Sequence, residues 1–545
     1  MKALWYATIG VATCTLISSV VRAPAPVVVE GQKGIVQQRT MPRFTVADDG
    51  EVEMQLPEQV PFLYTMGATK EWRDFPLDGR ISIGRADKRH TEHLVSLPTS
   101  ISWLHPDLGQ PSAIVVRVAE KFDANRIGTP YMATKVIEDH QGLPVISLLV
   151  AEGAFFDPDT GIYVSGNAII HPTPEMVTTH LEDGRWWKYP GNYHFRGKEW
   201  QRSGTVQLID GNGAEVFQSP VGIRINGQMT RGFPIHALRL LFDAPINSAL
   251  FEDGDGSGST ILLLRSAGND QMKAMMRDAL AHELCKGEPF EVSRSLACAV
   301  YVNGAYWGLH ELRQRVEEEE VARRYGVSDK DLAMLEIRSN HVLGKKKQVA
   351  LFESDLSDVL AMDPASNDFV ATVSERFDVD GFLSYMASVM ILDNKDWPDA
   401  NIKFWRYTGK HTMKAPLDGR WYFILTDMDL SLGAYGEPEA PLLDRIKGRS
   451  SPMPKLFYAC MGSPELRRTF ISKVEELING RFAANRTIET LDRFVSGMEP
   501  EMPRHIARWR RPLNMDTWHM EVDRIRTYLR ARPEQIRSQI PGLFK

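Results

Sequence analysis

The sequence predicts an α+β protein in which a β-rich first part is followed by a mostly helical last part. Residues 143–242 contain short apolar runs separated by Gly, Pro and Asp turns, a pattern typical of strands. Residues 464–545 are expected to be mostly helical, with Trp509 and Trp518 as core anchors. Ahead of both, residues 46–137 hold further β-rich runs, which predict a small β-sandwich accessory domain.

Composition places the chain among soluble globular proteins. It has 545 residues, enough for two or three domains with a large core. Its apolar content of 43% and charged content of 25% are ordinary for that class. The net charge is −6, and no strongly basic face or nucleic-acid motif is visible, which excludes nucleic acid as the expected partner. The few cysteines form no CxxC pair, which argues against a zinc site.

The N-terminus predicts export. Residues 1–23 resemble a signal peptide, because Lys2 precedes an apolar run that ends at a Pro- and Ala-rich stretch. We expect cleavage near Ala23 and a secreted or extracytoplasmic protein of the cell envelope. The run is long for a signal, so a retained segment would instead be a membrane anchor. Residues 24–45 are rich in Pro and Val and are expected to form a linker.

The 46–137 segment is predicted to be all-β. Its β-rich runs are "VPFLYTMGA" (60–68), "GRISIGR" (79–85) and "SAIVVRVAEKF" (112–122), with polar turns between them. Such a domain could bind sugar or serve only as a spacer.

Residues 221–242 predict a hairpin that carries arginines. Apolar and polar residues alternate on both sides of a Gly-rich turn, and the hairpin bears Arg224, Arg231 and Arg239. Arginines at such a turn can bind phosphate through paired hydrogen bonds. The alternative is a solvated hairpin edge, where charge discourages aggregation.

Two further elements follow. Residues 275–287 have helical spacing and end at Gly287, and Glu283 on this helix could pair with a basic residue near phosphates or could simply be an exposed charge. Residues 296–316 form two apolar runs around Asn303-Gly304, a strong hairpin signal.

The main chemical signal lies in residues 391–433. An apolar run, expected to be a helix at about 378–392, leads into the cluster that holds Asp396, with Asn401 five residues later. A second apolar run delivers Asp427 and Asp429 to its end. Acids at strand ends are often only turn and cap residues. Phosphoryl transfer, however, needs a carboxylate that orients the attacking hydroxyl and an amide and carboxylate that hold Mg²⁺. The combination predicts a metal site.

Several separated motifs, in order, resemble the spore coat protein H-like (CotH) kinase family, especially its larger bacterial members. The resemblance covers about residues 140–540. The motifs are "FFDPDTGIYVSGN" (155–167), "RINGQMTRGFP" (224–234), "LLLRSAGNDQMKAMMRDALAHEL" (262–284), "VYVNGAYWGLHELRQRV" (300–316), "DWPDANIKFWR" (396–406) and "RWYFILTDMDLSLG" (420–433).

The resemblance implies an atypical protein-kinase-like fold over residues 140–545, with a β-rich lobe that holds ATP and a helical lobe that holds the acids. It implies that Asp396 is the catalytic carboxylate. Asn401 and the acids Asp427 and Asp429 would hold Mg²⁺ or Mn²⁺, with Asp427 favoured as the main ligand. The arginines Arg224, Arg231 and Arg239 would line the nucleotide side.

The chain departs from the family pattern on that nucleotide side. Members usually carry Lys at or beside the positions of Ile235 and His236, and a Glu at the position of Gln314. A neutral imidazole supplies less charge to phosphates than an ammonium does. Both His236 and Gln314 are therefore candidate cofactor-binding residues whose chemistry differs from that of the family.

The resulting prediction is an exported, metal-dependent kinase that moves the ATP γ-phosphoryl group to Ser or Thr of a secreted or surface protein. A first alternative is a surface scaffold or adhesin that keeps the fold without catalysis. A second is a glycoside hydrolase that uses Asp396 and Asp427 as a carboxylate pair.

Overall fold

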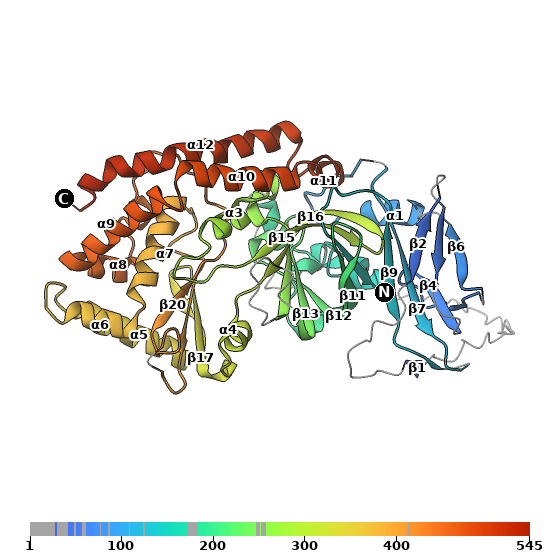
Figure 1. The fold of residues 1–545 in the computed structure, drawn as a ribbon, viewed down its shortest axis with the longest axis horizontal. Helices are drawn as coiled ribbons and strands as arrows, with labels where there is room; N and C mark the ends of the chain where they lie inside the picture. Colours follow the sequence, from blue (N-terminus) through green and yellow to red (C-terminus); the bar gives the residue numbers. More distant parts are fainter. Residues whose placement is uncertain are drawn as a thin grey trace, which may run out of the picture.

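The structure is a computed structural model, shown in Figure 1 with its helices and strands labelled. The predicted signal peptide (1–23) and most of the predicted linker (24–45) lie outside the residues that it describes. Within the described part of the chain, no helix has the length and apolarity needed to cross a membrane. The described residues are 28–29, 42–47, 51–56, 61–76, 78–84, 88–107, 109–123, 126–172, 184–246, 251, 258–412 and 414–544.

Two small sheets near the N-terminus form a sandwich. Alternating residues of both sheets, among them Val52, Met54, Ile114 and Val116, are buried in one shared core. The first sheet has the strand order β2 (Arg43–Val46), β3 (Val52–Gln55), β6 (Arg80–Gly84). The second sheet has the order β5 (Arg73–Asp74), β4 (Phe62–Met66), β7 (Ala113–Glu120), β9 (Tyr131–Val136). A short parallel pair joins β1 (Val28–Val29) to β8 (Arg126–Ile127).

The prediction that residues 46–137 are all-β is wrong at one place. Residues Lys88–Val95 form helix α1, whose Leu94 and Val95 are buried in the core of the following barrel. Tertiary burial of these two side chains therefore overrides the local sequence preference. Hydrogen bonds also fix the sandwich to the barrel, because Met132 N donates to Gln218 Oε1 at 2.9 Å and Gln207 Nε2 donates to Met132 O at 3.1 Å.

The central unit is a closed barrel of seven strands, the green region of Figure 1. Apolar side chains of alternate residues fill it, and Trp307 and Trp509 lie in its core. The neighbouring strands around it are β10 (Val145–Val150), β11 (Arg202–Ile209), β12 (Glu215–Ile225), β13 (Leu238–Ile246), β14 (Ser259–Arg265), β16 (Ala305–Gln314) and β15 (Ser295–Val302), which pairs in parallel with β10. The two predicted hairpins are the β12–β13 and β15–β16 pairs.

The C-terminal half (residues 318–544) combines a four-stranded sheet with most of the long helices. The sheet order is β18 (His341–Leu343), β17 (Leu332–Arg338), β19 (Ile402–Tyr407) and β20 (Trp421–Ile424). The helices are α4 (Glu318–Tyr325), α5 (Lys346–Leu360), α6 (Phe369–Arg376), α7 (Val379–Leu392), α8 (Pro452–Gly462), α9 (Pro464–Asn479), α10 (Ala484–Met498), α11 (Met502–Trp509) and α12 (Met515–Gln539). Two more helices, α2 (Glu152–Phe156) and α3 (Arg277–Leu284), come from the barrel segment.

Two tryptophans tie the helices to both cores, as expected from the sequence. Trp509 is buried and donates from Nε1 to Trp307 O in the barrel at 2.8 Å. Trp518 is buried in the core of the C-terminal half and donates to Ala274 O at 3.0 Å. Figure 1 shows α10 and α12 running along one side of the molecule from the C-terminal half towards the barrel. The barrel and the C-terminal half are thereby held against each other.

Candidate active site

A cleft of about 900 Å³ lies between the barrel and the C-terminal half. Its barrel wall comes from β12, β13, β14 and β16, and its other wall from parts of strands β17 and β19 and from two loops of the C-terminal half. We call these the Asp396 loop (residues 393–401, between α7 and β19) and the Asp427 loop (residues 425–435, after β20). Both loops follow the apolar runs that the sequence singled out.

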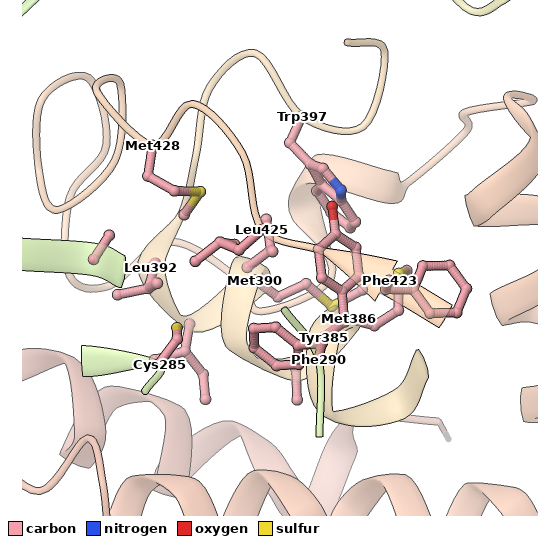
Figure 2. Close-up of a cluster of buried hydrophobic side chains, with 14 of the residues drawn as sticks. Cys285, Phe290, Tyr385, Met386, Met390, Leu392, Trp397, Phe423, Leu425 and Met428 are labelled. Atoms are coloured by element: carbon pink, nitrogen blue, oxygen red, sulfur yellow. The ribbon is translucent and has the colours of Figure 1, made fainter. Parts of the chain in front are cut away.

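Buried anchors fix the two loops. Trp397 and Met428 are 2% and 1% exposed and belong to the same core as Tyr385 of α7 and Phe423 of β20 (Figure 2). Each anchor directly follows a polar residue of interest, Asp396 or Asp427. Burial of the apolar member of each pair thus holds the neighbouring carboxylate at the cleft.

Hydrogen bonds join the two loops directly. Asn394 is 1% exposed, and its Nδ2 donates to Asp427 O at 2.9 Å while its Oδ1 accepts from Asp396 N at 3.3 Å. Farther along, Thr426 Oγ1 donates to Asn401 O at 2.7 Å. Asp396, Asn401, Asp427 and Asp429, which the sequence grouped, all line the one cleft.

The two acids of the Asp427 loop differ in their surroundings. The Asp427 side chain is 40% exposed, whereas that of Asp429 is 2% exposed. Asp429 Oδ2 accepts from the backbone N of Asn269 at 2.7 Å. Burial raises the pKa of Asp429 to about 8, and the nearby Asp427 adds to this shift, while Arg265 opposes it. Asp427 is therefore the more available of the two as a ligand.

Gly268 allows the backbone to lie close to the Asp429 carboxylate. Its φ is +59°, and a Cβ at this position would lie 2.1 Å from Asp429 Oδ2. Any larger residue would displace the carboxylate, so the glycine is required by both backbone conformation and space.

Arg265, which the sequence analysis did not single out, links these acids. Its Nη2 lies 2.6 Å from Asp427 Oδ1 and 3.6 Å from Asp429 Oδ2, and its Nε lies 3.2 Å from Asp278 Oδ2 on α3. Burial alone would lower the pKa of Arg265, but the carboxylates around it raise that pKa above its ordinary value. The signal was present in the sequence, since Arg265 ends an apolar strand as Asp427 follows one.

Asp396 is exposed at the cleft. Its pKa is raised, first by partial desolvation and then by the Asp427 carboxylate, while Lys395 acts in the opposite direction.

The barrel wall presents a row of side chains on one face. Arg224 on β12 is paired across the strands with Arg239 on β13, which is paired with Leu263 on β14 and so with Arg313 on β16. Side chains alternate along a strand, so this row faces the cleft while Ile223 and its counterparts fill the barrel. Arg224 donates to Gln201 Oε1 at 2.7 Å, and Arg239 to Glu317 Oε2 at 2.7 Å.

Arg231 also reaches the cleft, but most of its guanidinium donors are already bound to backbone carbonyls. It donates to the carbonyls of Gly227, Tyr193, Phe195 and Ile225 at 2.5–3.1 Å. The side chain is 6% exposed, and burial lowers its pKa to about 9. Arg231 therefore mainly holds the 226–232 turn in shape, and four of its five N–H donors are used there.

His236 and Glu283 are not brought to the cleft, which corrects the expectation for both. His236 is fully buried beside Tyr163 and makes a 2.9 Å hydrogen bond from Nε2 to Thr99 O. Glu283 lies on the other side of α3, where it contacts Arg493 at 3.5 Å. Sequence spacing could not reveal that residues 97–103 fold back onto the hairpin and enclose His236.

Gln314 lies at the edge of the cleft wall. It is 1% exposed and sits opposite Leu262, on the same side of the strand as the barrel core. Its side-chain amide has no hydrogen-bond partner among the described residues.

Cationic side chains outnumber acids around the cleft, so it favours a polyanion. The basic lining residues are Arg196, Arg224, Arg231, Arg239, Arg265, Arg313, Arg315, Arg338 and Lys403. The acidic ones are Glu336, Asp396, Asp427 and Asp429.

A basic cleft with carboxylates on one wall suits a ligand that carries phosphates together with a divalent metal. A family model described as "CotH kinase protein" matches residues 223–536, more than half of the chain. The chain belongs to the CotH kinase family. It is also similar to the crystal structure of a Helicobacter pylori proinflammatory kinase, CtkA, at 10% identity over 56% of this chain and 92% of that one, with a TM-score of 0.22. That score is too low to bear on the fold. No curated protein matches the chain.

A kinase family implies ATP and a divalent metal in general, and the residues present fit both. Within the described ranges, no group of three or more His, Cys, Asp and Glu side chains could hold a metal. Magnesium, however, is usually held by one or two carboxylates together with substrate phosphates. The exposed carboxylate of Asp427 and the amide of Asn401, facing a basic wall, meet that requirement.

Proposed function

We propose that this chain is a metal-dependent kinase that transfers the γ-phosphoryl group of ATP to a Ser or Thr hydroxyl of a secreted or surface protein. The observation that carries the proposal is the joining of the Asp396 and Asp427 loops through Asn394 at one basic cleft. Residues 1–23, which resemble an export signal, support the extracytoplasmic setting.

The nucleotide would lie against the barrel wall. Arg224 and Arg239 stand directly opposite each other across two strands, an arrangement that repels unless an anion or acid compensates it. Both pair with partly exposed neighbours and can exchange these for phosphate oxygens. Arg231 shapes the turn beside them, and Gln314 closes the inner edge.

Asn401 and Asp427 would hold the metal, and Asp429 would support their loop from behind. Asp429 is buried and bound to Asn269, so it orients the loop and is the poorer ligand. When bound, the metal supplies neutralisation of the charge on the ATP phosphates.

Asp396 would accept the proton of the acceptor hydroxyl. Its raised pKa makes the carboxylate a stronger base than an ordinary aspartate, while its exposure leaves room for a peptide. Most of the rate enhancement would come from positioning, because the transition state requires little covalent work from the protein.

Calorimetric titration with ATP tests the proposal. Wild type should bind ATP with Mg²⁺ and lose most of that binding with EDTA. Asp427→Asn should weaken Mg·ATP binding at least about tenfold, as expected for one lost metal ligand. Asp380→Asn, an exposed acid in the first turn of α7, is the matched control and should bind as wild type does. ATP binding that ignores EDTA, or no binding, would contradict the proposal and favour a scaffold.

A further inference from the structure

The end of β14 places one arginine among three carboxylates. Arg265 contacts Asp427 at 2.6 Å, Asp278 at 3.2 Å and Asp429 at 3.6 Å, and its side chain is only 14% exposed. The contact with Asp427 uses Oδ1, on the same carboxylate that the proposed function assigns to the metal. A dication and a guanidinium on one carboxylate repel each other.

We infer that Arg265 is a counter-ion that occupies Asp427 in the absence of metal, so that metal and nucleotide bind to this chain cooperatively. The inference rests on the proposed function. Metal alone would bring two positive charges beside the guanidinium and is disfavoured. A triphosphate supplies the negative charge that allows both cations to remain.

The surroundings prevent Arg265 from moving far from the site. Asp278, which holds its Nε, is 2% exposed, accepts from the backbone N of Met428 at 2.6 Å and contacts Arg313. These contacts tie Arg265 to α3, to β16 and to the Asp427 loop itself. An arginine that stays on Asp278 remains at the cleft wall, where its outer nitrogens can bind phosphate oxygens in a pair.

A second arginine of the barrel wall also makes binding of metal alone unfavourable. Arg313, one residue from Gln314, is 5% exposed, and burial followed by the charge of Arg265 lowers its pKa to about 9. A metal that arrives without phosphate therefore meets two guanidinium groups, Arg265 and Arg313, beside the Asp427 carboxylate.

The test measures binding of Mn²⁺ alone, by electron paramagnetic resonance of the free ion, to wild type, Arg265→Gln and Arg265→Lys. Arg265→Gln should bind Mn²⁺ at least about tenfold more tightly than wild type. Its metal–nucleotide coupling, the factor by which saturating Mn²⁺ tightens ATP binding, should fall by a similar factor, since coupling is reciprocal. Arg265→Lys keeps the charge and should bind Mn²⁺ alone as weakly as wild type.

Arg376→Gln is the matched control. Arg376 also faces three acids, Asp358 at 3.0 Å, Asp355 at 3.8 Å and Glu375 at 3.8 Å, but does not line the cleft. It should leave Mn²⁺ binding unchanged. Equal or weaker Mn²⁺ binding by folded Arg265→Gln would overturn the inference.

Wild type gives a second measurement that needs no variant. It should bind ATP at least tenfold more tightly with Mn²⁺ than with EDTA, and equal affinities would overturn the inference together with the proposed metal dependence, even if Arg265→Gln does not fold. Metal-dependent ATP binding whose coupling is unchanged in Arg265→Gln defeats only the inference. Binding of neither metal nor nucleotide by any variant would defeat the proposed function as well.

Discussion

Removal of the Asn394 side chain tests whether the two loops of the cleft act as one unit. Asn394 is 1% exposed and does not line the cleft, so it cannot touch a substrate. Its amide connects the backbone of Asp396 to the carbonyl of Asp427. Asn394→Ala should therefore disturb the spacing of the two carboxylates without removing either.

The expected loss of stability follows from those contacts. The bond to Asp427 O at 2.9 Å is well formed, and the bond from Asp396 N at 3.3 Å is weaker. Each of these two hydrogen bonds contributes about 0.5–1.5 kcal/mol to the free energy of unfolding, and their removal leaves the partly buried Asp427 carbonyl unpaired. Asn394→Ala should therefore lower the free energy of unfolding by roughly 2–3 kcal/mol. Because a misplacement of about 1 Å can cost about a hundredfold in rate, phosphoryl transfer should fall by about that factor.

Urea unfolding and transfer of labelled phosphate from ATP measure the two effects. Asn303→Ala is the matched control, because buried Asn303 accepts from Val150 N at 2.9 Å in the β15–β16 turn, away from the cleft. It should lose stability yet transfer phosphate at the wild-type rate below its unfolding range. If Asn394→Ala lost stability but kept full transfer, the claim that this amide positions the site would be wrong.

Three further predictions separate the roles of individual side chains. Asp429→Asn should weaken Mg·ATP binding less than Asp427→Asn does, measured by calorimetry, because Asp429 is buried and already bound to Asn269. Glu283→Gln should leave ATP binding unchanged, whereas Arg231→Gln should lower the unfolding free energy, since four carbonyls lose their donor. Burial, opposed by the Thr99 carbonyl, lowers the pKa of His236 to about 3, below its ordinary 6.5. The unfolded chain then binds more protons between these values, so His236 makes the fold less stable as pH falls from 6.5 towards 3. From pH 7 to 5 this loss is about 2 kcal/mol, and urea unfolding should show it reduced in His236→Gln.

Much of the fold follows from local sequence signals. The Asn303-Gly304 turn predicts its hairpin, and the apolar run before Asp393 predicts α7, because both signals depend on neighbouring residues only. Helix α1 was missed, since its apolar residues gain their burial from the barrel. Closure of that barrel by the parallel pairing of β10 with β15, about 150 residues apart, leaves no local trace.

The candidate site shows the same division. Asp396 and Asp427 could be grouped from sequence because each follows an apolar run, and Asn401 because it lies five residues after Asp396. Their mutual distance could not, since it depends on buried Asn394 and on Trp397 and Met428 in one core (Figure 2). His236 was misplaced for a related reason. It is a polar residue in a hairpin with phosphate-binding character, and only the three-dimensional contacts show that it is buried against the Thr99 carbonyl.

Transfer of labelled phosphate from ATP by wild type and by Asp396→Asn probes the central claim most directly. A secreted-protein fraction or a Ser- and Thr-rich peptide serves as acceptor, with Mg²⁺ or Mn²⁺ present. Wild type should transfer label from ATP to the acceptor, and the rate of transfer should be about 10²–10⁴-fold lower for Asp396→Asn. The affinity of the variant for Mg·ATP should stay within about twofold of the wild-type value. Equal labelling by the two proteins would mean that the Asp396 carboxylate is a spectator and that the chemistry of this cleft lies elsewhere.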